Sequence, residues 1–304
     1  MSISKVIFAI SDYTNHPRRN YKRYPQVVRE KDIVFGAYGN DTALDIYYPK
    51  DYEGKLPVLV NVHGGGYVRG DKRFRSGIAN FFASHGWFVV NTNYRLAPKA
   101  TFPAATEDTL NALNYINNED FVNKYPIDLS RLVVSGDSAG GYYAAHSVAS
   151  ATNSELQEKL NLPKYEGAKV TALLTFCAPY DLMKCFTKKT PLNVTVDITN
   201  SVFGTSYKTN EIDDTFMYTD EVNVLAYLTK DFPKTLSIAA VNDGICGGQL
   251  DGAISAFEKA GISHDFYLME EKGDGHCTHL LPFKKGTKPV MEKVIEFLES
   301  VKNG

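Results

Sequence analysis

The sequence predicts an α/β fold in which helices cover both faces of a mainly parallel sheet and a small cap lies over it. Two observations lead to this fold class. Short β-rich runs alternate with helical patterns from the third run onward. Apolar runs such as Leu59-Val60-Asn61-Val62 and Leu132-Val133-Val134 are typical of buried central strands. Alternation of this kind produces parallel strands joined by helical crossovers.

The expected strands are eight short segments, at about 31–37, 42–48, 57–62, 87–93, 131–135, 168–176, 235–241 and 264–270. The expected helices lie near 75–85, 104–118, 139–152, 248–260 and 287–301. The first two strands lie beside turn signals such as Gly39-Asn40-Asp41. We therefore expect these two strands to form an antiparallel edge of the sheet.

Residues 1–304 are expected to form a single domain, because Gly and Pro are scattered and no repeat or low-complexity tract divides the chain. Two segments do not follow the alternation. Residues 1–30 show no clear period, and residues 181–232 form a long polar stretch. Excursions of that length are usually lids or binding loops, so we assign both to the cap.

The composition is that of a soluble globular protein, with 43% hydrophobic and 22% charged residues. The 33 Lys and Arg against 35 Asp and Glu give a net charge of −2, so no overall field favours nucleic acid or anionic lipid. No run approaches the roughly 20 apolar residues of a membrane-spanning helix. The apolar run at 6–10 is too short for a signal peptide, which predicts a cytoplasmic location.

The four cysteines, in a chain without a secretion signal, are expected to stay reduced. A metal site could combine His276, Cys277 and His279, but this short spacing matches no common zinc pattern. We therefore expect neither disulfides nor a bound metal or other cofactor.

The segment Gly136-Asp137-Ser138-Ala139-Gly140 matches G-x-S-x-G directly after an apolar strand and before a helix-compatible run. This context is that of a nucleophile elbow, a sharp turn that presents Ser138 at the end of the strand. Small residues two before and two after the serine let the chain reverse. The backbone N–H of Ala139 is expected to stabilise developing negative charge. The alternative is a tight turn with a chance serine.

The segment His63-Gly64-Gly65-Gly66 follows a predicted strand, and its glycines leave backbone N–H groups unobstructed. Such groups can form an oxyanion hole, and we expect Gly65 and Gly66 to be the donors. A flexible turn and a phosphate-binding loop are the alternatives, but no Lys-Ser/Thr pair follows, as a P-loop would require. His63 is expected to shape the loop rather than to act as a base.

These motifs, together with Asn93-Tyr94-Arg95-Leu96-Ala97-Pro98, resemble those of the hormone-sensitive-lipase-like carboxylesterases of the α/β-hydrolase superfamily. The resemblance runs from about residue 30 to 301 and implies the α/β-hydrolase fold. In that superfamily the serine is followed along the chain by an acid and then by a histidine. The family's Asp-Pro-Leu-x-Asp pattern is replaced here by Asn242-Asp243-Gly244-Ile245-Cys246.

Four histidines follow Ser138 and could supply the base. His146 lies in the helix that follows the elbow, and His264 lies in the last predicted strand. His276 lies on a Gly-rich loop just past that strand, which resembles the family's Gly-x-x-His, and we choose it as the base. His279 is the second choice, and both could be ordinary loop histidines.

The acid is expected on the loop after the strand 235–241, and Asp243 is the first carboxylate beyond that strand. Asp251 lies in the next helix and is the second choice. Asp231 precedes the strand and would lie at its wrong end. The alternative for Asp243 is a turn-forming role beside Gly244.

The sequence thus predicts a serine carboxylesterase that hydrolyses small short-acyl esters through an acyl-enzyme, with Ser138, Asp243 and His276 as the triad. Tyr67 and Phe203 are candidates to line an acyl pocket. One alternative is an arylformamidase or other amidase of the same fold. Another is a non-catalytic small-molecule receptor, although receptors of this type commonly lose the histidine. The expected partner is a small-molecule ester, and the sequence permits a homo-oligomer.

Overall fold

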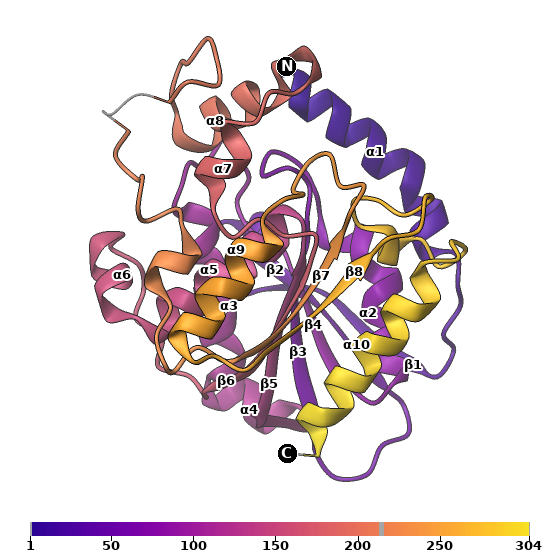
Figure 1. Cartoon of the computed structure of the whole chain (residues 1–304). Coiled ribbons are helices and arrows are strands. Elements are labelled where there is room, and N and C mark those ends of the chain that lie inside the picture. The colour runs from indigo at the N-terminus through magenta and orange to yellow at the C-terminus, as the bar shows by residue number, and fades with distance from the viewer. Residues whose placement is uncertain (1, 213–215, 304) are drawn as a thin grey trace.

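The computed structural model describes residues 2–212 and 216–303. Its centre is a sheet with the strand order β1-β2-β4-β3-β5-β6-β7-β8 (Figure 1). The strands are β1 (Val27–Val34), β2 (Ala43–Pro49), β3 (Leu56–Val62), β4 (Phe88–Thr92), β5 (Ile127–Asp137), β6 (Val170–Phe176), β7 (Lys234–Ala240) and β8 (His264–Met269). All eight overlap the segments that the sequence predicts as strands.

The sheet is mainly parallel with an antiparallel edge, as predicted. β1 pairs antiparallel with β2, and β2 pairs antiparallel with β4. The remaining neighbours pair in parallel, from β4 through β3, β5, β6 and β7 to β8. Because parallel strands point the same way, the loops that follow β3, β5, β7 and β8 open at one edge of the sheet.

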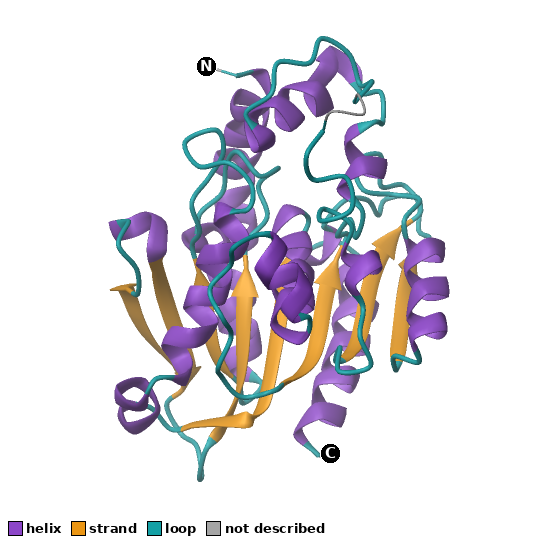
Figure 2. Cartoon of the chain, turned by 90° about the vertical axis from the view of Figure 1, so that its left-hand side faces the viewer, coloured by secondary structure: helices purple, strands orange, loops and turns teal. Residues whose placement is uncertain are grey.

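Side chains that alternate along the strands divide the interior into two cores, one on each face of the sheet. In β3, Val58 and Val60 contribute to one core and Leu59 to the other. The first core is covered by α3 (Ala104–Asn117), α5 (Ala139–Thr152) and α9 (Leu250–Ala260). The second is covered by α2 (Ser76–Ser84) and α10 (Thr287–Lys302). Helices therefore lie on both faces, as Figure 2 shows.

These five helices correspond to the five that the sequence predicts. Two short helices, α4 (Glu119–Lys124) and α6 (Ser154–Lys159), were not expected. Each is preceded by an N-cap asparagine, Asn118 or Asn153, whose side chain accepts a backbone N–H of the first turn. Their brevity leaves little room for an apolar period that would reveal them in the sequence.

The two segments assigned to the cap lie together above the carboxyl ends of the strands (Figure 2). They contribute α1 (Ile3–Asn20), α7 (Leu182–Phe186) and α8 (Val194–Phe203). The Ser4 N–H of α1 donates to the Asp197 carboxylate of α8 at 2.8 Å. This contact joins two parts of the chain that are far apart in the sequence.

The helix within residues 1–30 was not predicted from the sequence. Ile3, Val6, Ile7 and Ile10 recur at helical spacing, but the structure leaves all four exposed and buries Ser4 and Asp12 instead. An amphipathic helix usually turns its apolar stripe toward the core, whereas α1 turns it outward.

No helix among residues 2–212 and 216–303 is long and apolar enough to cross a membrane.

The central strands should dominate stability. Leu59 in β3 is fully buried, whereas Leu192 in the cap segment is 70% exposed. Leu59→Ala should lower the free energy of unfolding by about 2 to 5 kcal/mol, because it removes buried methyl groups and leaves a cavity. Leu192→Ala, the matched control, should change it by less than about 0.5 kcal/mol. Chemical denaturation measures both, and similar losses would contradict the assignment of Leu59 to the core.

Candidate active site

The elbow lies where β5 ends at Asp137 and α5 begins at Ala139. Ser138 between them has φ 54° and ψ −126°, a conformation that L-residues rarely adopt and that concentrates at functional sites. A Cβ atom added to Gly136 would lie 2.4 Å from the Gly140 carbonyl oxygen, and one added to Gly140 would lie 2.3 Å from the Val62 carbonyl oxygen. The two glycines therefore let the turn close tightly around the serine.

The structure brings Ser138, His276 and Asp243 together, although they follow three different strands. The Ser138 hydroxyl lies 2.8 Å from His276 Nε2, and His276 Nδ1 lies 2.8 Å from Asp243 Oδ2. With the ring proton on Nδ1, the imidazole donates to the carboxylate and accepts from the serine. This is the arrangement that a serine nucleophile and its general base require.

The two charged partners stabilise each other. Burial lowers the pKa of His276, but the hydrogen bond and the negative charge of Asp243 outweigh burial and raise it above its ordinary value. For Asp243, burial raises the pKa, but the hydrogen bond and charge of His276 and two backbone N–H groups outweigh burial and lower it. Asp243 is therefore held as a carboxylate.

Asp243 also has the turn-forming role that was its alternative interpretation. Its Oδ1 accepts the backbone N–H groups of Ile245 and Cys246, each at 2.9 Å. Its other oxygen remains for His276. The two roles coexist on one side chain. Asp251, the second choice, is exposed in the first turn of α9.

The other candidate bases are engaged elsewhere. The ring of His279 stacks on Phe176 with centroids 3.8 Å apart, and burial lowers its pKa to about 3. His146 contacts Thr106 Oγ1 at 3.0 Å and the Glu221 carbonyl at 2.8 Å. Burial lowers the pKa of His146 to about 4. His264 at the start of β8 contacts the carbonyl of Ile262 at 3.1 Å.

The glycine loop after β3 lies against the elbow. A Cβ atom added to Gly64 would lie 3.0 Å from the Ser138 Cβ, so the loop and the serine are in direct contact. Gly65 and Gly66 have φ values of 151° and 59°. Ala139 is the first residue of α5, where backbone N–H groups have no partner within the helix. The three expected oxyanion donors thus belong to segments that adjoin Ser138.

His63 shapes this loop, as the sequence predicts. Its ring stacks on Tyr94 with centroids 4.4 Å apart, and the Tyr94 hydroxyl donates to the His63 carbonyl at 2.8 Å. His63 Nδ1 donates to the Gly64 carbonyl at 3.0 Å. Burial lowers the pKa of His63 to about 4, so the ring is neutral at physiological pH.

Sequence reasoning missed a buried ion pair beneath the serine. Arg75 Nε and Nη2 donate to the Asp137 carboxylate at 2.7 and 2.6 Å, and both side chains are at most 4% exposed. The same carboxylate accepts the Gly64 N–H at 3.2 Å. Burial raises the pKa of Asp137, but Arg75 outweighs it and lowers the pKa. The position of Asp137 beside the serine was the only signal in the sequence.

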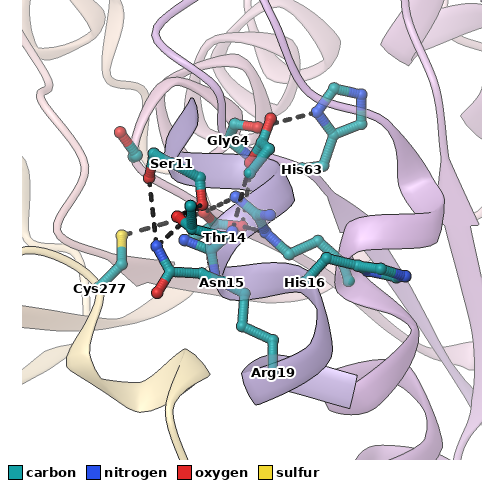
Figure 3. A network of polar contacts seen from close by, with 12 residues as sticks. Ser11, Thr14, Asn15, His16, Arg19, His63, Gly64 and Cys277 are labelled. Carbon is teal, nitrogen blue, oxygen red and sulfur yellow. Dashed lines mark hydrogen bonds and ion pairs between the residues drawn. The ribbon is translucent and has the colours of Figure 1, made fainter. Parts of the chain in front are cut away.

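The cap helix α1 borders this polar region. Figure 3 shows Ser11, Asn15 and Arg19 of α1 in one view with Gly64 and Cys277, and Asn15 Nδ2 donates to the Ser11 carbonyl at 2.8 Å. Asp12 of α1 forms an ion pair with Arg19 at 3.3 Å. The Asn20 side chain at the end of α1 accepts the Ser76 hydroxyl at 3.0 Å, and Ser76 directly follows Arg75, so this cap element is joined to the frame of the candidate site.

Aromatic rings extend from the glycine loop into the cap. Tyr67, which directly follows the glycines, packs edge to face on Phe186 of α7 at 5.6 Å. Phe186 contacts Phe203 of α8 at 5.8 Å, and Phe203 contacts Phe216 at 4.6 Å. The two aromatic residues that the sequence suggested for an acyl pocket, Tyr67 and Phe203, thus belong to one cluster.

A separate cavity of about 510 Å³ lies between α1, α2 and α10, and its lining includes Phe81, His279 and Met291 but not Ser138. We therefore locate the candidate chemistry at Ser138 rather than in this cavity.

Among the described residues, two sets of side chains beside His276 could hold a metal ion together with it. One set is Cys177 with Cys277, and the other is Asp243 with Cys246. Neither set contains His279, which the sequence had suggested.

The chain is similar in sequence to known ester hydrolases. The profile of the BD-FAE family matches residues 44–247. Probable carboxylesterase 1 of Arabidopsis thaliana is 25% identical over 289 residues, which cover 90% of this chain and 86% of that protein. Probable carboxylic ester hydrolase LipM of Mycobacterium tuberculosis is 29% identical over 176 residues, which cover 56% of this chain but only 39% of LipM.

Solved esterase structures share the fold. Esterase B from Lactobacillus Rhamnosis superposes with a TM-score of 0.85 over 99% of this chain and 94% of its own, at 18% identity. A second structure concerns the same esterase and a C4-C4 SN3 tributyrin phosphonate. Because the family profile covers more than half of the chain, the protein belongs to the BD-FAE family, among the hormone-sensitive-lipase-like esterases of the α/β-hydrolase superfamily.

Proposed function

We propose that this protein is a serine carboxylesterase that hydrolyses small short-acyl esters. The observation that carries the proposal is the pair of 2.8 Å contacts that links Asp243, His276 and Ser138 beside a glycine loop. A non-catalytic receptor would not need a serine, a base and a carboxylate in this alignment.

In the proposed reaction, Ser138 Oγ attacks the ester carbonyl carbon while His276 Nε2 accepts the hydroxyl proton. The backbone N–H groups of Gly65, Gly66 and Ala139 donate to the oxyanion of the tetrahedral intermediate. His276 then gives the proton to the departing alkoxide, which leaves as the alcohol. Water repeats the sequence on the acyl-enzyme and releases the carboxylic acid, so no cofactor is needed.

The cap and the aromatic cluster support a short acyl chain. We propose that α1, α7 and α8 form the cap and that Tyr67 and Phe203 limit the length of the acyl site. The tributyrin phosphonate associated with the Lactobacillus esterase is consistent with chains of this size. The partner is then a small-molecule ester rather than nucleic acid or membrane. A cytoplasmic location stays a prediction from the sequence, which also permits a homo-oligomer.

The acyl-length prediction is tested with p-nitrophenyl esters from acetate to palmitate. The value of kcat/KM should be highest between acetate and hexanoate, because the cluster leaves little room for longer chains. Ser138→Ala measures the background rate. A steady rise through palmitate, or a jump above the micellar concentration, would contradict the proposal. Faster turnover of N-formylkynurenine than of p-nitrophenyl acetate would favour the arylformamidase alternative.

The role of Asp243 is tested by Asp243→Asn. The change should lower kcat by about 10⁴-fold, because an amide cannot hold the ring proton on Nδ1 or stabilise the imidazolium. Asp251→Asn is the matched control and should keep its activity, since Asp251 is exposed in α9. Circular dichroism checks that both variants fold. Near-normal activity of a folded Asp243→Asn protein would remove Asp243 from the triad.

The pH profile reports on His276. The imidazole must be neutral to accept the serine proton, so kcat/KM should fall as the pH drops through the pKa of His276. The sequence alone places this pKa near the ordinary value of about 6.5, and the structure moves it upward through Asp243. NMR titration of His276 should give a lower pKa in Asp243→Asn than in the unaltered protein. A flat rate profile between about pH 5 and 8 would exclude His276 as the base.

A further inference from the structure

We infer that Cys177, Cys277 and His276 form a binding site for a soft divalent metal ion of the Zn²⁺ type, whose occupation blocks the active site. One Sγ atom from each cysteine and a ring nitrogen of His276 all lie within 4.8 Å of one another. Thiolate and imidazole are the ligands that Zn²⁺ prefers. The inhibitory effect rests on the proposed function, whereas the binding itself does not.

The distances are close to those that the metal needs. Zn–S bonds of about 2.3 Å and Zn–N bonds of about 2.0 Å at tetrahedral angles separate two sulfurs by about 3.8 Å and a sulfur from a nitrogen by about 3.5 Å. With all three ligand atoms within 4.8 Å, each pair needs to approach by no more than about 1.3 Å. Rotation of the side chains can supply a change of that size.

The backbone already directs the two cysteines toward each other. Cys177 directly follows β6, and Cys277 directly follows His276 on the loop after β8. The Cys277 N–H donates to Cys177 Sγ at 3.3 Å, which holds the first sulfur against the loop of the histidine. Both thiols are buried and free of disulfide bonds. The three side chains can therefore bind one metal ion without a rearrangement of the backbone.

One carboxylate beside the three ligands favours a cation, and a cavity gives the ion access to them. Asp243 Oδ2 lies 2.8 Å from His276 Nδ1 and has no arginine partner among the described residues, whereas Asp137, whose Oδ2 lies 3.9 Å from Cys277 Sγ, is paired with Arg75. Cys177 and Asp243 also line a cavity of about 190 Å³ between β6, β7 and α9. A small hydrated ion fits such a space.

Binding would remove the base from the reaction. The two thiols lose their protons to solvent, and their sulfurs and one ring nitrogen each donate an electron pair to the metal. Both ring nitrogens of His276 are engaged, Nδ1 with Asp243 and Nε2 with Ser138. Coordination through either nitrogen therefore breaks one of these contacts. We expect the loss to appear in kcat rather than in KM, because the acyl site is untouched.

Metal binding is tested optically with Co²⁺ as the probe, on full-length protein that has been reduced and kept free of oxygen. One equivalent of Co²⁺ should produce thiolate-to-metal charge-transfer absorption and visible bands of tetrahedral coordination, and Zn²⁺ should abolish both. Absence of these bands at millimolar Co²⁺ would overturn the inference. This measurement uses no ester, so it stands even if the proposed esterase activity fails.

The ligands are tested with Cys177→Ser and Cys277→Ser, and with the alanine variants where a serine variant does not fold. Each should weaken Zn²⁺ and Co²⁺ binding by more than about 10-fold. Cys185→Ser is the matched control, since Cys185 is also a buried thiol but belongs to neither set of ligands beside His276. Equal weakening by Cys185→Ser would overturn the assignment. If Cys246→Ser alone weakened metal binding, the assignment would also be overturned, because the ligands would then be Asp243, Cys246 and His276.

Inhibition is tested by titrating ester hydrolysis with Zn²⁺ and then adding EDTA. Activity should fall as the charge-transfer bands report occupancy, and it should return when the metal is removed. The concentration of Zn²⁺ that halves activity should rise by more than about 10-fold in Cys277→Ser and should not change in Cys185→Ser. Full activity with one metal ion bound would show that the site exists but does not block His276, and would overturn the inhibitory part.

Discussion

The buried contact between Arg75 and Asp137 holds together the parts of the candidate site. Removing two charges from water costs several kcal/mol for each ion, and short hydrogen bonds must offset this cost. Here the carboxylate accepts two bonds from Arg75 and a third from the Gly64 N–H. Because Asp137 directly precedes Ser138, the same side chain fixes the nucleophile and the glycine loop in one frame. A shift of Arg75 would disturb both.

The sequence could predict those features of the fold and the site that depend on local patterns. The strands around Leu59 and Val133 were visible as short apolar runs, and Ser138 was visible because glycines, a strand and a helix-compatible run surround it. Asp243 and His276 could be selected because parallel strands bring their following loops to one edge of the sheet. The structure places all three side chains in one hydrogen-bonded row.

The features that the sequence did not reveal depend on contacts between distant segments. Arg75 and Asp137 are 62 residues apart, and no local pattern marks either as a partner of the other. The helix α1 buries Ser4 against Asp197 of α8, whereas its apolar residues Ile7 and Ile10 are exposed. Its position therefore depends on contacts with distant polar groups, which a hydrophobic pattern does not reveal.

Asp243 combines a structural and a proposed chemical role through its two oxygens. Oδ1 accepts the N–H groups of Ile245 and Cys246 and so fixes the turn after β7, while Oδ2 contacts His276. The turn orients the carboxylate through contacts that do not involve the histidine loop, so the imidazole contacts a charge in a fixed position. An asparagine at this position can keep the turn through its carbonyl oxygen, whereas an alanine cannot. Comparing the two substitutions therefore separates the charge on the imidazole from the geometry of the turn.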